Sequence, residues 1–279
     1  MNARALLMWV AGALVVDLAS DNPVVRVLVA LVAIDLLLVL TPRGRSLTPT
    51  LVAVLVFATT ALALNVALSH TGRNVLVRLP DWLPLVGGPL TLESLAFGLT
   101  AGLGIGGAVL AVAPISLVLE PHELIDALPD PLERSGLAIA TALNLVPGIG
   151  RNAVAIHDAE RMRGWRPRGV RSWSEILVPT ILTSVEDALA LAEAMEARAY
   201  GLGRRTTYAV RGWSVRDVLS VFGAVVAAGA FLAARLAGVP LDWQPYPAVS
   251  LPPLPAPLIG AALLLALPVI PWPSRRSID

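Results

Sequence analysis

Between residues 151 and 212, two arginine-bearing segments stand in an otherwise apolar chain. The first is Asp-Ala-Glu-Arg-Met-Arg-Gly at residues 158–164, and the second is Ala-Met-Glu-Ala-Arg-Ala-Tyr-Gly at residues 194–201. Lipid accommodates so many charges only at a high cost, and apolar runs flank the stretch on both sides. We therefore expect a folded cytosolic piece, held between membrane spans and available to a cytosolic partner.

The composition is typical of an integral membrane protein. The chain has 279 residues, of which 56% are hydrophobic and 15% charged, whereas a soluble domain carries about 25% charged residues. Its mean hydropathy is +0.73. The absence of Cys excludes disulfides and thiol chemistry. All 21 basic residues are Arg, so the chain lacks the lysine with which a P-loop holds phosphate.

Apolar runs predict an all-α, polytopic membrane helix bundle with five or six spans. Two short runs favour a helical hairpin, three longer runs favour full spans, and the last run is punctuated by proline; they cover residues 5–19, 24–40, 47–69, 91–119, 214–237 and 256–272. The predicted organisation is therefore N-terminal membrane spans over 1–119, a cytosolic domain over 120–213 and C-terminal membrane spans over 214–279.

The placement of arginine predicts the orientation in the membrane. With the N-terminus inside, all but four of the 21 arginines face the cytosol, as the positive-inside rule requires. The four exceptions are Arg26, Arg73, Arg78 and Arg235. The same orientation puts residues 120–213 in the cytosol.

Three helices are expected within the cytosolic block. A short amphipathic helix covers 121–128, a long one covers 131–163 and is kinked or broken near Pro147, and a second long one covers 175–199. Arg163 and Arg198 fall at the C-terminal ends of the long helices, where a cation complements the helix dipole. From the residues alone, a dipole and topology role and a docking contact remain equally open for these two arginines.

Small residues and acids inside the apolar runs are further candidates. Gly98, Gly102 and Gly106 form a stripe at a spacing of four, which favours close helix packing or a sliding surface for a partner membrane protein. Asp35 is the better candidate for an intramembrane site than Asp17, which stands near the end of its run and can reach the headgroups. For Asp35 we expect a structural partner inside the bundle, with a proton or ion site as the alternative.

Motifs of catalytic and metal sites are missing from the sequence. It contains neither a nucleophile elbow nor a zinc-protease signature, and its His and acidic residues do not repeat at ligand spacing. We expect no catalytic residues, no metal site, no cofactor and no nucleic-acid partner.

An ordered set of motifs resembles the T component of energy-coupling factor (ECF) transporters, the EcfT/CbiQ family. The set begins with the threonine-led start of a span at 91–95 and the Pro-His-Glu-Leu-Ile-Asp-Ala-Leu stretch at 121–128. It continues with a helix that contains Pro147, and ends with two short Ala-Arg-Gly-like signatures, Met162-Arg163-Gly164 and Ala197-Arg198-Ala199. Met162 and Ala199 depart from that signature. Ala199 fits a left-handed helix cap poorly, so Gly201 is the expected substitute.

This resemblance implies a scaffold that couples ATPases to transport. Two cytosolic ATP-binding-cassette subunits would receive Arg163 and Arg198, and a separate membrane S component would bind a vitamin or a transition-metal ion. The residues implied in ATPase coupling are Met162, Arg163, Gly164, Ala197, Arg198 and Ala199, with Glu160, Glu196 and Pro147 supporting the coupling helices. The implied location is the plasma membrane of a prokaryotic cell.

Two other classes of function compete with the scaffold. One is a membrane-embedded enzyme that uses intramembrane carboxylates or His, and the other is a stand-alone channel or carrier that uses Asp35. Co-purification with nucleotide-binding subunits separates the scaffold from both.

Overall fold

The computed structural model describes residues 1–41, 46–69, 71–79, 88–119, 123–124, 127, 133–166, 169–200 and 212–270. The chain divides into two compact units, one formed by Met1–Glu120 with Arg211–Asp279 and the other by Pro121–Val210. The predicted helix at 121–128 and the predicted cap Gly201 lie largely or wholly outside the described residues.

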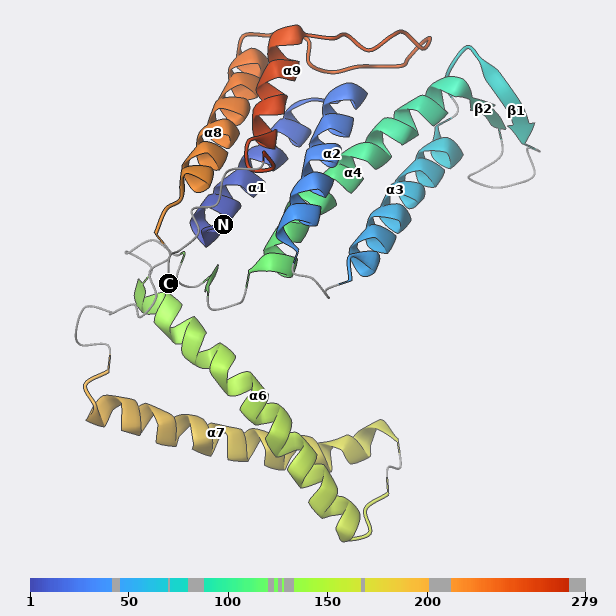
Figure 1. The fold of residues 1–279 in the computed structure, drawn as a ribbon. Helices are drawn as coiled ribbons and strands as arrows, with labels where there is room; N and C mark the ends of the chain where they lie inside the picture. Colours follow the sequence, from blue (N-terminus) through green and yellow to red (C-terminus); the bar gives the residue numbers. More distant parts are fainter. Residues whose placement is uncertain are drawn as a thin grey trace. The chain divides into compact units, whose positions relative to one another are not determined.

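The first unit is a bundle of helices (Figure 1). It contains α1 (Ala3–Ala19), α2 (Pro23–Leu40), α3 (Thr48–Leu68), α4 (Leu92–Val118), α8 (Val215–Leu236) and α9 (Ala256–Leu263), which a short 3-10 turn, η3 (Leu264–Ala266), follows. Four of them, α2, α3, α4 and α8, are long and apolar enough to cross a membrane. The predicted helical membrane fold is confirmed.

The last apolar run differs from its predicted span in length, whereas the first does not. Helix α1 has 17 residues and is about as short as its run predicted. The last apolar run forms a helical segment only over Ala256–Ala266, which at about 1.5 Å per residue is far shorter than a bilayer core. Among the described residues, full spans by length are therefore confined to α2, α3, α4 and α8.

Local sequence signals set the starts of these helices. The side chain of Asn22 accepts a hydrogen bond from the Val24 amide, and Pro23 occupies the first helical turn. Ser214 and Asp217 form a reciprocal capping box at the start of α8. The backbone amide of Asn2 donates to the carboxylate of Asp217 at 2.9 Å. The N-termini of α1 and α8 therefore lie at the same end of the bundle.

A two-stranded antiparallel hairpin precedes α4 and was not predicted. It pairs β1 (Val75–Leu79) with β2 (Gly88–Thr91). Thr91 caps α4 by accepting a hydrogen bond from the Ser94 amide, and its hydroxyl donates to the Thr71 carbonyl at 2.9 Å. The Glu93 carboxylate is fully buried and accepts from the Asn74 amide at 3.2 Å. The threonine-led start of this span thus fastens the chain before the helix to its first turn.

The second unit consists of two long helices that pack against each other (Figure 1). Helix α6 covers Glu133–Met162, and α7 covers Ser174–Ala197 after the short 3-10 turn η2 (Val170–Trp173). The side-chain amide of Asn152 donates to the carboxylate of Asp187 at 2.8 Å, and this hydrogen bond joins the two helices. None of the four candidate spans lies in the described part of this unit.

A break of the helix at Pro147 is excluded, because α6 continues through this residue. A proline removes one backbone donor and leaves the carbonyl four residues earlier without its usual partner. Here that residue is Leu143, and both Leu143 and Pro147 are exposed. The freed carbonyl therefore stands on an open face, and the bonds on either side keep the helix intact.

Candidate functional site

The first arginine signature closes α6 with a Schellman turn. The amide of Trp165 donates to the Glu160 carbonyl at 2.9 Å, and the amide of Gly164 donates to the Arg161 carbonyl at 3.0 Å. Gly164 has a φ of +85°, the left-handed conformation that this turn requires and that glycine adopts without strain. Arg163 is the residue between the helix and the left-handed position.

The second signature closes α7 with the same turn. The amide of Tyr200 donates to the Met195 carbonyl at 3.0 Å, and the amide of Ala199 donates to the Glu196 carbonyl at 2.9 Å. Ala199 itself has a φ of +53°. The expectation that Gly201 replaces it as the left-handed residue is therefore wrong: the alanine takes the conformation, at a cost of about 1–2 kcal/mol. Arg198 thus occupies the position that Arg163 has on α6.

The side chains of Arg163 and Arg198 differ in their contacts. Arg163 donates through Nη1 to Oε1 of Glu160 at 3.0 Å, with 75% of its side chain exposed. Arg198 is exposed, and the described part of the chain gives it neither a side-chain hydrogen bond nor an ion pair. The spacing explains the difference, because residues three apart face each other on a helix and residues two apart do not. Glu196 stands two residues before Arg198.

Aromatic contacts add to the end of α6 and were missed by the sequence reasoning. The ring of Trp165 meets the ring of His157 at 5.8 Å and that of Trp173 at 6.3 Å, both edge to face. An open depression beside them is lined by His157, Arg161, Gly164, Trp165 and Arg166. The available signal was the aromatic residue directly after Gly164, a position that Tyr200 occupies at the other end.

The glycine stripe of α4 lies against α3 of the same chain. A Cβ atom added at Gly102 would lie 2.8 Å from the Ala58 carbonyl oxygen, and one added at Gly98 would lie 3.0 Å from the Asn65 Cβ. At Gly106 the neighbour is Val54, at 3.3 Å. The stripe therefore brings the backbones of α3 and α4 close together, and α3 covers it.

The two intramembrane aspartates have exchanged the environments that we expected. Asp17 is 1% exposed, and neither of its carboxylate oxygens has a partner among the described residues. A Cβ atom at Gly107 would lie 3.1 Å from its Oδ1, so α4 packs directly on this side chain. Asp35 is exposed on α2. The predictions that Asp17 reaches the headgroups and that Asp35 pairs inside the bundle are both wrong, because the faces of α1 and α2 that meet their neighbours carry Asp17 and not Asp35.

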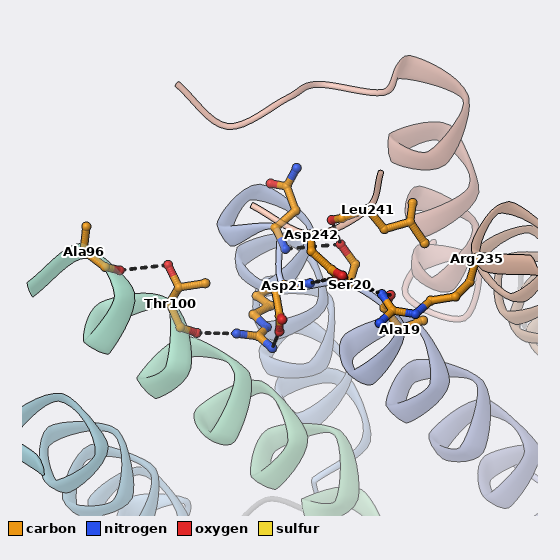
Figure 2. Close-up of polar contacts among 10 residues, drawn as sticks. Ala19, Ser20, Asp21, Ala96, Thr100, Arg235, Leu241 and Asp242 are labelled. Carbon is orange, nitrogen blue, oxygen red and sulfur yellow. Dashed lines mark hydrogen bonds and ion pairs between the residues drawn. The ribbon is translucent and has the colours of Figure 1, made fainter. Parts of the chain in front are cut away.

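Two of the four exceptional arginines are neutralised at the turn between α1 and α2 (Figure 2). Arg26 pairs with Asp21 and donates through Nη1 to the Thr100 carbonyl at 2.8 Å. Arg235 pairs with Asp242 at 2.7 Å and donates to the Ala19 carbonyl at 3.1 Å.

The same turn holds the loop that follows α8. The Ser20 hydroxyl donates to the Leu241 carbonyl at 2.8 Å (Figure 2). The Asn22 side-chain amide donates to the Pro253 carbonyl at 2.6 Å. These contacts lie at the end of the bundle opposite the N-termini of α1 and α8.

Residues that could hold a metal ion are not grouped in the described part of the chain. No three His, Asp or Glu residues there come close enough together to form such a site.

Comparison with known proteins adds independent information. The family described as cobalt transport protein, CbiQ, matches residues 1–209. Three curated relatives carry the name energy-coupling factor transporter transmembrane protein EcfT. The protein of Lactobacillus helveticus is 34% identical over 112 residues, 38% of this chain and 40% of its own length. That of Streptococcus equi is 34% identical over 137 residues, or 44% and 49%. That of Streptococcus thermophilus is 37% identical over 109 residues, or 37% and 41%. The matches therefore span less than half the length of each relative.

Proposed function

Because the chain belongs to the CbiQ family of cobalt transport proteins, we propose that it is the transmembrane coupling subunit of an ATP-driven uptake transporter of the energy-coupling factor type. Two cytosolic ATP-binding-cassette subunits hydrolyse ATP and bind its long helices. A separate membrane S component binds the cargo, a vitamin or a transition-metal ion. The chain itself is not catalytic, and it resides in the plasma membrane of a prokaryote.

The matching ends of α6 and α7 are the observation that carries the proposal. Each end presents one exposed arginine directly before a left-handed residue, on a turn that two backbone hydrogen bonds fix. The guanidinium of an arginine at such a turn can make a bidentate contact with a carboxylate. Two equivalent ends suit two equivalent ATPase subunits, one arginine for each.

The order and direction of the helices support the placement of the N-terminus and residues 120–213 on the same side of the membrane. Helices α3 and α4 run antiparallel, since Val54 faces Gly106 and Asn65 faces Gly98. In the first unit, α1 and α8 begin at the end of the bundle where α4 finishes (Figure 1). The segment between α4 and α8 therefore leaves and re-enters at the N-terminal end, which the arginine bias assigns to the cytosol.

The length of the long helices supports a mechanical role. Helix α6 has 30 residues and α7 has 24, which correspond to about 45 Å and 36 Å at 1.5 Å per residue. A rigid rod of this length moves its far end when a bound ATPase closes. Because α6 and α7 pack against each other, a movement of one helix also moves the other.

A co-purification experiment tests the proposed function. The tagged chain is co-expressed with the two ATP-binding-cassette subunits of the same genome, and the ATPase retained per chain is measured after purification in detergent. The wild-type chain is expected to retain both subunits. The double variant Arg163→Ala/Arg198→Ala is expected to lose them at an unchanged level in the membrane.

Arg151→Ala is the matched control for this experiment. Arg151 is an exposed arginine on α6, twelve positions before Arg163, about 18 Å along the helix. Its replacement removes the same charge but not the helix end, so both ATPase subunits should be retained. Equal retention by the double variant and the wild type would refute the docking role.

A further inference from the structure

The outward face of α2 carries a carboxylate among apolar side chains. Val27, Leu31, Asp35 and Leu38 follow one another at intervals of four, four and three residues, so they share one face of the helix. All four are exposed, with Leu31 at 54% and Leu38 at 62%. The opposite face, which includes Val25, Val29, Val32 and Leu36, is buried.

Asp35 lies inside the apolar part of the span. Helix α2 has 18 residues, about 27 Å, which is slightly less than the thickness of a bilayer core of about 30 Å. Asp35 stands five residues before the last residue of the helix, Leu40, about 8 Å along the axis. An aspartate side chain is too short to bridge that distance to the headgroups.

No described residue of the chain compensates Asp35. It has no hydrogen bond and no ion pair within the described residues, whereas Arg26 on the same helix is held by Asp21 and the Thr100 carbonyl. An unpaired carboxylate that faces lipid is costly, and such residues in membrane proteins mark contacts and pathways. Because Asp35 faces away from the bundle, a pathway through the bundle does not use it.

We propose that this face of α2 binds a transmembrane helix of a second membrane protein, which places an arginine or a lysine at the depth of Asp35. The apolar residues above and below the carboxylate would pack against that helix, and the basic group would pair with Asp35 in a surrounding that excludes water. A second copy of the chain is a poor occupant, because the same face would set two carboxylates against each other. The proposal rests on the proposed function, in which the partner is the membrane subunit that binds the cargo.

The test measures the complex of this chain with both ATPase subunits and the membrane S component of the same genome. The chain carries the tag, and the retained amounts of the ATPases and of the S component are measured separately. Asp35→Asn is expected to lower the affinity for the S component about 3- to 20-fold, the range of a lost polar contact between membrane helices. Asp35→Arg is expected to abolish its retention, and an Arg→Asp or Lys→Asp change in the partner should restore it.

Two leucines provide a second test of this face and its matched control. Leu31→Ala, on the proposed face, should weaken retention of the S component. Leu18→Ala, at a residue of α1 that is 74% exposed, should leave it unchanged. All four variants should keep the ATPases. Loss of ATPases already in the wild type would refute the proposed function, whereas full retention of the S component by every Asp35 variant would refute the contact at α2.

Two further measurements separate the other occupants. Thermal unfolding of the isolated chain in detergent should not fall on Asp35→Leu, and a lower midpoint would mean that the carboxylate has a partner inside the chain. The sequence has no native Cys, so Leu31→Cys provides a single thiol in the membrane. A disulfide-linked homodimer of that variant would overturn the proposal in favour of self-association.

Discussion

The ends of α6 and α7 have the same backbone turn but different side chains around it. On α6 the left-handed residue is Gly164, the arginine is paired with Glu160, and Trp165 contacts two aromatic rings. On α7 the left-handed residue is Ala199, and Arg198 has no side-chain partner within the described residues. Contacts within its own unit therefore stabilise the α6 end, whereas no described residue binds the side chain of Arg198.

The two helix ends therefore share the position of the arginine and not its surroundings. Each arginine stands at the C-terminal end of its helix, where the free carbonyls favour a cation. If both ends dock on equivalent subunits, the two arginines must reach the same docking geometry although different side chains surround them.

The largest expected effect tests whether both ends face the same side of the membrane. If the ends of α6 and α7 have equivalent roles, they must lie on the same side of the membrane. The arginine bias predicts that this side is the cytosol. Single-cysteine variants Met162→Cys and Glu196→Cys should react with a membrane-impermeant thiol reagent only from the cytosolic side. Leu251→Cys, in the exposed loop after α8, should react only from the outside.

The cysteine-free sequence makes each label unambiguous. Labelling of Met162→Cys and Glu196→Cys from different sides would end the equivalence of the two helix ends. Labelling of all three variants from one side would overturn the orientation.

The next effect concerns each arginine separately. Arg163→Ala and Arg198→Ala should each weaken ATPase binding by about 2–5 kcal/mol, because each leaves a carboxylate of the partner buried and unpaired. Arg→Lys should recover part of this, since a lysine keeps the charge but loses the bidentate geometry. Titration of the ATPase subunit onto the chain in nanodiscs measures the effect. A change of less than about 1 kcal/mol for both alanine variants would leave only the dipole role.

Sequence reasoning predicted local features better than the directions of side chains. The start of α7 at Ser174 lies one residue from the predicted start at residue 175, and the apolar character of α2, α3, α4 and α8 was expected. These features depend on neighbouring residues and on run length. The arginine positions at the helix ends were also visible, because a helix end and a charge are both local.

The environments of Asp17 and Asp35 were not predictable from the sequence. Both stand in helices that are apolar on all sides, so no polar face indicates which side meets another helix. The direction of Asp17 is decided by contacts of α1 with α8 and α4, and that of Asp35 by contacts of α2 with α4, all of them far away in the sequence. Ala199 is a third case, because the hydrogen bonds of the turn, and not the preference of alanine, set its backbone.

A smaller effect tests the left-handed residues of the two turns. Ala199→Gly should stabilise the end of α7 by about 1 kcal/mol, since it removes the strain of a side chain at positive φ. Gly164→Ala should destabilise the end of α6 by a similar amount. Nothing lies within 4 Å of the added Cβ, so only the backbone conformation opposes it. Hydrogen exchange of the Tyr200 and Trp165 amides, which close the turns, measures both changes.

Gly150→Ala is the control for these changes. Gly150 lies inside α6, and a Cβ atom added there also meets nothing within 4 Å. Alanine is favoured over glycine by about 0.5–1 kcal/mol in a helix interior, so this variant should stabilise α6. The same substitution in one helix should therefore have opposite signs at positions 150 and 164. Equal signs would show that Gly164 is not held in the left-handed conformation.

The smallest effect comes from the pairing that only the α6 end has. Glu160 holds Arg163 through an exposed pair three residues apart, which is worth about 0.2–0.5 kcal/mol. A partner carboxylate must displace Glu160, so Glu160→Gln should tighten ATPase binding at this end by up to about twofold. Glu196→Gln should have no such effect, because Glu196 does not face Arg198. The difference should shrink in high salt, which screens the exposed pair. Weaker binding by Glu160→Gln would mean that Glu160 orients Arg163 for its partner instead of competing for it.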